Sequence, residues 1–334
     1  MNQKNTSPKH LLTLADVSKQ DVIDLIALAC LYKEKTWERK GLSYRRPKIN
    51  NSSSDIEKRY RAGDFDKPLR DRFVTMVFTK ASTRTRLAFE RAVFDLGGGC
   101  AFLGPGDSQL SRGESIDDTL KVVERSSDIV VVRSHDHGSL ESACKWISVP
   151  IVNALSELYH PTESLADLMT MMETVSNNLS KHKAVYLGDA NNVARSFALA
   201  CHHLDVPCHI ATPDGKNFPK LPSFFTDGKG ENSCVVFSDD PKQAVKGAKF
   251  IYTDTWHSMG DQLSNRDEKF LPFQVNEDLV KEACSDYVFL HCLPAYRGKE
   301  VVATIIDGKH SHVFDQAENR THTIKALLAL FSDR

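Results

Sequence analysis

The chain has 334 residues, of which 41% are hydrophobic and 26% are charged, and its formal net charge is −1. This length is sufficient for two α/β lobes of ordinary size, each with its own core. The balanced charge favours neither a nucleic-acid nor a membrane surface, and no apolar run approaches the roughly 18 residues of a membrane span.

The first residues, MNQKNTSPKH, contain neither an apolar signal core nor an arginine-rich transit pattern, so we expect a cytoplasmic protein. The eight cysteines include no C-x-x-C pair, and we expect thiols in a reducing compartment, most of them small core residues. The close histidine pairs have no second pair of cysteines or histidines at zinc-site spacing. We therefore expect no metal and no cofactor.

The first predicted element is a helix that follows Ser18. The stretch Ser18-Lys-Gln-Asp21 resembles a capping box, and Val22, Leu25 and Ile26 begin an apolar face behind it. The composition changes over residues 38–70, which contain ten Lys or Arg and five Asp or Glu. We interpret this segment as a solvated insertion, a flexible loop rather than a basic docking patch.

A polar block, Ser82-Thr-Arg-Thr-Arg86, separates a predicted strand from a predicted helix. The strand is the apolar run Phe73–Phe78, and the helix has an apolar face from Phe89 to Leu96 that Gly97 ends. Backbone N–H groups, hydroxyls and guanidiniums collect at such a junction, which suits a phosphate or a carboxylate. The alternative interpretation is a Ser or Thr N-cap followed by two arginines that face water.

Further along the chain, predicted strands alternate with predicted helices, which indicates parallel sheets. The first lobe continues with strands at 129–132 and 147–151 and a helix at 162–173. A second lobe has strands at 184–187, 250–253 and 287–290, and a helix with Phe197, Ala200, Cys201 and Leu204 on one face. Ligands of parallel sheets bind at the carboxyl ends of strands, where this sequence places Asp254, His291 and Cys292.

Taken together, these clusters resemble the aspartate/ornithine carbamoyltransferase family, most closely the members that use ornithine. Any one of the motifs is weak, but their order along most of the chain is specific. The motifs are Ser82–Thr85, Ser108–Ser115, Arg133, His160–Thr162, Gly188–Asn192, Asp254–Gly260, His291–Pro294 and Glu318–Arg320.

The resemblance implies an α/β fold of two lobes, each with a mostly parallel sheet flanked by helices, and an active site in the cleft between them. Residues 1–160 would form a carbamoyl-phosphate-binding domain, with the helix 321–334 packing back on it, and residues 161–320 an ornithine-binding domain. The family's activity is carbamoyl transfer from carbamoyl phosphate to L-ornithine. Family members form trimers whose active sites lie between subunits.

The resemblance also assigns roles to individual residues. The implied carbamoyl-phosphate ligands are Ser82, Thr83, Arg84, Thr85, Gln109 from a neighbouring subunit, Arg133, His160, Glu163, Leu293 and Arg320. The implied ornithine ligands are Asn191, Asn192, Asp254, Ser258, Met259 and Cys292. The catalytic residues would be Arg84, Arg133, His160 and Cys292. Arg133, His160 and Thr85 would hold the carbamoyl oxygen, because preorganised donors stabilise the charge that develops on it, and Cys292 would lie near the δ-amine.

Structural interpretations remain open for single residues. Asn191 and Asn192 could be turn residues, Cys292 a packed thiol, and His160 a helix-entry residue. Two features depart from the family pattern: Glu163 stands where Gln is usual, and the 38–70 segment is longer. Competing functions are a sister enzyme that uses putrescine or an acylated ornithine, and a catalytically silent sensor of either substrate.

Overall fold

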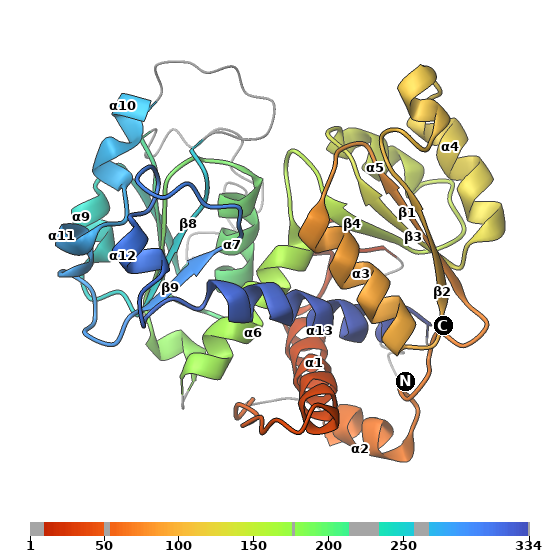
Figure 1. Cartoon of the computed structure of the whole chain (residues 1–334), viewed down its shortest axis with the longest axis horizontal. Helices are drawn as coiled ribbons and strands as arrows, with labels where there is room; N and C mark the ends of the chain where they lie inside the picture. Colours follow the sequence, from red (N-terminus) through yellow and green to blue (C-terminus); the bar gives the residue numbers. More distant parts are fainter. Residues whose placement is uncertain (1–9, 50–53, 176–177, 214–233, 257–266, 333–334) are drawn as a thin grey trace, which may run out of the picture. The chain divides into compact units, whose positions relative to one another are not determined.

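The structure, a computed structural model, describes residues 10–49, 54–175, 178–213, 234–256 and 267–332. The chain divides into two compact units, the first Met1–Ala166 with Glu318–Arg334 and the second Asp167–Ala317. Two helices, α6 (Pro161–Thr174) and α13 (Val313–Ser332), contribute residues to both units (Figure 1). Among the described helices, none combines the length and the apolarity that crossing a membrane requires.

The first unit contains a parallel sheet in the strand order β2-β1-β3-β4. Its strands are β1 (Phe73–Phe78), β2 (Gly99–Leu103), β3 (Ile129–Arg133) and β4 (Ile151–Leu155). All five residues of β3 are buried, as expected of a central strand covered on both faces. The carboxyl ends of β1 and β3 therefore lie side by side, with Phe78 paired to Arg133.

This unit also contains helices, and two of them, those that begin at Lys19 and Thr83, follow start signals predicted from the sequence. The helices are α1 (Lys19–Arg39), α2 (Ser54–Ala62), α3 (Thr83–Asp95), α4 (Ile116–Val123) and α5 (His137–Ala143), with 3₁₀ turns at Leu14–Asp16, Gln109–Arg112 and Glu124–Ser126. The predicted capping box is confirmed, because the backbone N–H of Asp21 donates to Ser18 and that of Ser18 donates to Asp21. Phe89 on α3 is fully buried, which confirms the apolar face expected there.

The second unit contains a parallel sheet in the order β7-β6-β5-β8-β9. Its strands are β5 (Ala184–Leu187), β6 (Cys208–Ala211), β7 (Val235–Ser238), β8 (Phe250–Thr253) and β9 (Val288–His291). Its helical elements are η4 (Leu179–Lys181), α7 (Asn192–His203), α9 (Pro241–Val245), α10 (Asp267–Phe270), η6 (Leu271–Phe273), α11 (Glu277–Val280) and α12 (Ala303–Ile306). The predicted α/β fold with two parallel sheets is confirmed.

One predicted strand was wrong in position. The run 147–151 was expected to be extended, but β4 begins only at Ile151. The backbone N–H of Ile147 donates to the carbonyl of Ala143 at 2.9 Å, so the end of α5 holds it. Ile147 packs in the core, where it is 1% exposed, and this burial explains an apolar residue at a position outside the strand.

The interpretation of 38–70 as a loop was also wrong, although most of its described residues are exposed or intermediate, as expected of a solvated segment. This segment contains α2, and Ile56, Phe65 and Leu69 are 6%, 1% and 0% exposed. The hydroxyl of Tyr32 on α1 donates to the carbonyl of Phe65 at 2.9 Å. Because these apolar residues are scattered singly among charges, no helical or strand period announces their burial.

The cysteines are less buried than expected. Cys30, Cys201 and Cys208 are buried, Cys100 is exposed, and the other four are intermediate. The expectation that most are core residues is therefore wrong. The more exposed cysteines lie at edges and ends of elements, for example Cys100 on the outer strand β2 and Cys144 at the C-cap of α5.

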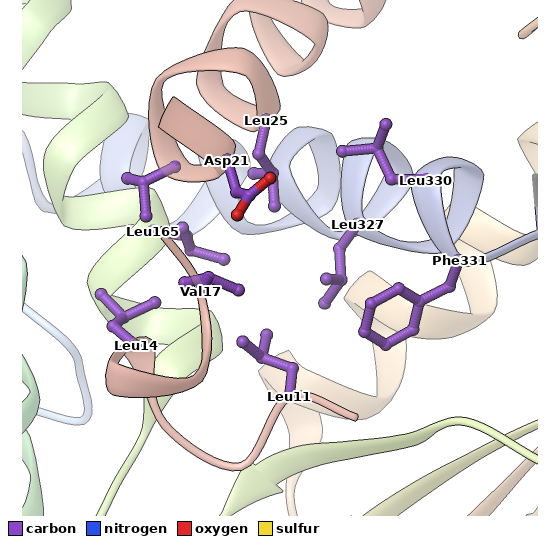
Figure 2. Close-up of a pocket in the computed structure, with 10 residues that line it drawn as sticks. Leu11, Leu14, Val17, Asp21, Leu25, Leu165, Leu327, Leu330 and Phe331 are labelled. Atoms are coloured by element: carbon purple, nitrogen blue, oxygen red, sulfur yellow. The ribbon is translucent and has the colours of Figure 1, made fainter. Parts of the chain in front are cut away.

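An apolar pocket in the first unit is lined by side chains from the N-terminal stretch, α1, α6 and α13 (Figure 2). Among its lining residues only Asp21 is charged, and that carboxylate is used by the cap of α1, where it accepts from the Ser18 hydroxyl at 2.6 Å. The pocket therefore offers packing surface rather than reactive groups, and the polar clusters at the strand ends are the better candidates.

The burial of the 38–70 segment can be tested with Phe65→Ala. Since Phe65 is 1% exposed, we expect a loss of about 3–5 kcal/mol in the free energy of unfolding, as for other buried Phe→Ala changes. Leu42→Ala, in the same segment but 50% exposed, is the matched control and should change it by less than about 0.5 kcal/mol. Urea unfolding measures both, and equal small losses would restore the flexible-loop interpretation.

Candidate functional site

The first cluster of polar side chains lies where β1 gives way to α3. Ser82 occupies the N-cap position of α3, but its side chain makes no capping hydrogen bond. Instead its hydroxyl accepts from Nη1 of Arg133, the last residue of β3, at 3.4 Å. The sheet therefore brings a guanidinium, 6% exposed, to the first turn of α3.

The two arginines of the polar block differ. Arg86 is exposed, pairs with Glu90 at 2.8 Å, and lies over the Phe102 ring at 3.9 Å from its centroid. Arg84, two residues earlier, is intermediate in burial. The water-facing interpretation thus holds for Arg86, whereas Ser82 does not act as the simple N-cap of that alternative.

A buried ion pair lies beside Thr85. Nη1 of Arg320, on α13, is 3.0 Å from Oε2 of Glu163, in the first turn of α6, and both side chains are almost fully buried. Nη2 of Arg320 donates to the hydroxyl of Thr85. These contacts join the starts of α3 and α6 to α13 through one guanidinium. A charge removed from water in this way requires such partners.

His160 precedes α6 and approaches the same carboxylate. Its Nε2 is 3.3 Å from Oε2 of Glu163, and its Nδ1 is 3.4 Å from the Thr162 hydroxyl. Burial lowers the pKa of His160 well below its usual value, and the nearby Arg320 and Arg133 lower it further. The ring is therefore neutral near pH 7, so its contact with Glu163 is not an ion pair.

The second cluster belongs to the second unit and is centred on Asp254, directly after β8. Oδ1 of Asp254 accepts from the Thr255 backbone at 2.7 Å and from the Cys292 thiol at 3.0 Å. Oδ2 accepts from Nδ2 of Asn191 at 2.8 Å. Asp254 is only 8% exposed, so neutral donors satisfy a carboxylate that has little contact with water.

Asn191 connects this carboxylate to α7. Its Oδ1 accepts from the backbone N–H groups of Val193 and Ala194, both at 3.0 Å, so Asn191 is the N-cap of α7. The Tyr186 hydroxyl lies 3.3 Å from the same oxygen. Burial, reinforced by Asp254, raises the pKa of Tyr186 well above its usual value, so it remains a phenol that can donate.

The chain after β9 places Cys292 and Leu293. Leu293 has φ 57°, a left-handed conformation that is costly for a leucine, and its backbone N–H donates to Nδ1 of His291 at 2.8 Å. Nε2 of His291 is 3.2 Å from Oε1 of Glu300, and both side chains are fully buried. His291 therefore supports the backbone that carries Cys292 and Leu293.

Ligand-type atoms of Asp254, His291 and Cys292 lie within 4.8 Å of one another, a spacing that could accommodate a cation. However, Nδ1 of His291 already accepts from Leu293 and Nε2 faces Glu300. Because both ring nitrogens of His291 already have partners in the protein, this side chain is better suited to hydrogen bonding than to binding a metal ion.

The remaining predicted residues lie apart from these contacts or outside the described residues. Thr83 is exposed at the start of α3, and Asn192, the first residue of α7, is intermediate in burial. Gln109 is exposed on its 3₁₀ turn, where its side chain accepts from Arg112 at 3.3 Å. Ser258 and Met259 fall in 257–266, outside the described residues.

Sequence reasoning did not identify Tyr186 or Glu300 as parts of these clusters. Tyr186 lies inside the apolar run of β5, where the pattern indicates only a core residue. Glu300 follows the site motif by several residues in a charged stretch, Arg297-Gly-Lys-Glu300, which is typical of a solvated loop. The one available signal was the position of Tyr186 just before a polar turn.

Comparison with known proteins matches both parts of the chain to one family. Residues 9–173 match the family model described as the aspartate/ornithine carbamoyltransferase carbamoyl-P binding domain, and residues 180–331 match the Asp/Orn binding domain of the same family. An ornithine carbamoyltransferase of Caldicellulosiruptor saccharolyticus is 39% identical over 324 residues, which cover 96% of this chain and 97% of that protein.

Solved structures agree as well. The ornithine carbamoyltransferase of Pyrococcus furiosus has a TM-score of 0.82 at 38% identity, covering 97% of each chain. The anabolic ornithine carbamoyltransferase of Campylobacter jejuni has a TM-score of 0.79 at 34% identity, covering 98% of this chain and 100% of that one. The chain therefore belongs to the aspartate/ornithine carbamoyltransferase family.

Proposed function

We propose that this chain transfers the carbamoyl group of carbamoyl phosphate to the δ-amine of L-ornithine, giving L-citrulline and phosphate. The observation that carries the proposal is the gathering of buried donors at the start of α3. Arg133, His160 and Arg320 are 6%, 4% and 2% exposed, and Arg133 and Arg320 contact Ser82 and Thr85. Among the described residues, no partner accepts from Nε of Arg320, so it has a donor available for an anion.

The first unit would bind carbamoyl phosphate. Ser82, Thr83, Arg84, Thr85 and Arg320 hold the phosphate, and Arg133, His160 and Thr85 donate to the carbamoyl oxygen. When the amine attacks, a C–N bond forms, negative charge moves onto that oxygen, and the donors stabilise it. The C–O bond to phosphate then breaks, the amine loses a proton, and phosphate leaves toward the arginines. Positioning and charge stabilisation suffice, so no covalent enzyme intermediate is required.

The second unit would bind ornithine. Asp254 pairs with the α-ammonium, and Cys292 with the Leu293 carbonyl lies near the δ-amine. Asn192, Ser258 and Met259 hold the amino-acid head. Asn191 acts largely by orienting Asp254, since its oxygen caps α7 and its amide donates to that carboxylate.

The domains of this enzyme would be 1–160 with the helix 321–334 for carbamoyl phosphate, and 161–320 for ornithine. The division of the chain into compact units after Ala166 and before Glu318 supports these limits to within a few residues. The assembly is a homotrimer in the cytoplasm, with Gln109 of a neighbouring subunit completing each phosphate site. The exposed position of Gln109 supports this last point. The metabolic role is arginine biosynthesis, in line with the relative named anabolic.

An acceptor assay tests the proposal. Ornithine should be carbamoylated, whereas putrescine should react at least about 100-fold more slowly, because it leaves the Asp254 carboxylate without its ammonium partner. N-acetylornithine and aspartate complete the panel. Asp254→Asn is the matched control, and in this variant the reaction rates with ornithine and with putrescine should differ by a smaller factor. Equal or faster reaction with putrescine would favour the sister enzyme, and binding without turnover would favour a sensor.

The pH dependence should follow the acceptor amine. An alkyl ammonium has a pKa of about 10.4, so only about 10⁻³ to 10⁻⁴ of it is the free amine at neutral pH. We expect the apparent second-order rate with ornithine to rise from about pH 6.5 to about 8.5. Because the pKa of His160 is lowered, this ring is already neutral at the start of that range and contributes no rise of its own. His160→Asn should therefore slow the reaction but keep the rise. A flat profile, or a rise lost in that variant, contradicts this assignment.

Glu163 should not be required for phosphate binding. A carboxylate about 6 Å from each charge of a phosphate would repel it by roughly 3 kcal/mol at an effective dielectric of about 20. Its pairing with Arg320 offsets this repulsion. We expect Glu163→Gln to bind carbamoyl phosphate equally or more tightly in calorimetry. Glu90→Gln, which removes a partly exposed carboxylate paired with Arg86, is the control. Binding at least about tenfold weaker in Glu163→Gln would make the carboxylate a positive element of the site.

A further inference from the structure

The position of Arg320 depends on contacts made by its two predecessors on α13. Lys33 on α1 donates from Nζ to Oδ1 of Asn319 at 2.7 Å. Trp37, one turn further along α1, donates from Nε1 to Oε1 of Glu318 at 2.9 Å. The helix α1 is therefore tied to α13 at the residues directly before Arg320. Successive helical residues point in directions about 100° apart, so Glu318 and Asn319 can bind α1 while Arg320 turns toward Thr85.

Lys33 is a buried ammonium held by more than one contact. Its side chain is 3% exposed, and Nζ lies 5.3 Å from the centroid of the Trp37 ring and 5.1 Å from that of Tyr44. Cation–π contacts of this kind are stronger when the cation is removed from water. Because a displaced ammonium would lose these partners, Lys33 resists movement and so restrains Asn319.

Glu318 adds charge to this arrangement. The close approach of His322, whose Nε2 lies 3.6 Å from Oε1 of Glu318, and after it contacts with Trp37 and Lys33 lower the pKa of Glu318 to about 2 despite its burial. The group is thus a carboxylate at any pH at which the enzyme would work. Its charge strengthens the hydrogen bond from Trp37.

The 38–70 segment encloses Lys33. Tyr44 packs edge-on against Trp37, with ring centroids 5.7 Å apart. Arg46 then pairs with Glu57 of α2 at 3.1 Å and approaches Glu34 of α1 at 3.9 Å. The segment that is longer than usual for the family is therefore attached to α1 at the residue next to Lys33.

We propose that Lys33 and Trp37 are positioning residues for carbamoyl transfer: they hold Glu318 and Asn319 so that the Arg320 guanidinium meets Thr85 and Glu163, and Tyr44 completes the enclosure of Lys33. Neither residue touches substrate. The inference rests on the proposed function, because it concerns the phosphate site of the first unit. The effect of losing either residue on catalysis should be large, because a displacement of about 1 Å in a positioned group can cost about 100-fold in rate.

Steady-state kinetics with Lys33→Met tests this role. The substitution removes the ammonium but keeps an unbranched apolar side chain. The KM for carbamoyl phosphate should rise at least about tenfold, and inorganic phosphate should inhibit more weakly by a similar factor. The KM for ornithine at saturating carbamoyl phosphate should stay within about threefold. Assays are run well below the melting temperature of each variant, so that a loss of stability alone does not move these constants.

Two further variants make the test specific. Lys35→Met, on the same helix, removes an exposed lysine that pairs with Asp66 and should leave every constant unchanged. Asn319→Ala should reproduce the effect of Lys33→Met. Because the two residues act through one contact, the double variant should be no worse than the poorer single variant, whereas independent effects would multiply.

The outcomes separate this inference from the proposed function. If the unmutated chain does not carbamoylate ornithine, the proposed function fails. If it does, and folded Lys33→Met keeps its KM for carbamoyl phosphate, or its effect multiplies with that of Asn319→Ala, the positioning role is wrong. Should Lys33→Met not fold, Trp37→Phe keeps the ring but loses the donor to Glu318 and should raise the same KM at least about threefold. An unchanged KM in both Trp37→Phe and Asn319→Ala would overturn the inference.

Discussion

The burial of the Arg320 guanidinium is the constraint on which the first polar cluster depends. A cation that is 2% exposed must find partners within the protein, and it finds them on separate elements, Thr85 of α3 and Glu163 of α6. Along the chain, Thr85 follows β1 and Glu163 follows β4. Satisfying one buried charge therefore brings the starts of two helices together and creates a site rich in donors.

Glu163 shows how a departure from a family pattern can be absorbed locally. A carboxylate in a site for an anion is unfavourable by itself, but it lies 3.0 Å from one buried guanidinium and 3.3 Å from a neutral imidazole. The guanidinium balances its charge, and the neutral imidazole adds none. The result is a cluster that keeps Arg133 as a second cation, while Thr85 and Glu163 both contact Arg320.

The second unit uses the opposite arrangement. Asp254 is a carboxylate surrounded by neutral donors, an amide, a thiol and a backbone N–H, none of which cancels its charge. It therefore keeps an electrostatic preference for a cation, while the first cluster keeps one for an anion. The two substrates of the proposed reaction differ in the same way, because carbamoyl phosphate is anionic and the head of ornithine carries an ammonium. In the proposed reaction, the first unit would thus select the anionic substrate, and the second unit would select the ammonium group of ornithine.

The sequence by itself determined several of the elements and the places along the chain of the polar clusters. The strands at 184–187 and 250–253 and the apolar face of α3 follow from hydrophobic patterns within a few residues. Polar residues that directly follow parallel strands lie at the carboxyl ends of those strands, where ligands bind. Only the tertiary structure decided that Glu163 pairs with Arg320, that Asn191 caps α7 while holding Asp254, and that Tyr44 covers Lys33. The contacts of Glu163 with Arg320 and of Asn191 with Asp254 join residues far apart in the chain, and no local period encodes them. The partner of a buried charge is chosen by which elements meet, and that is settled only when the chain is folded.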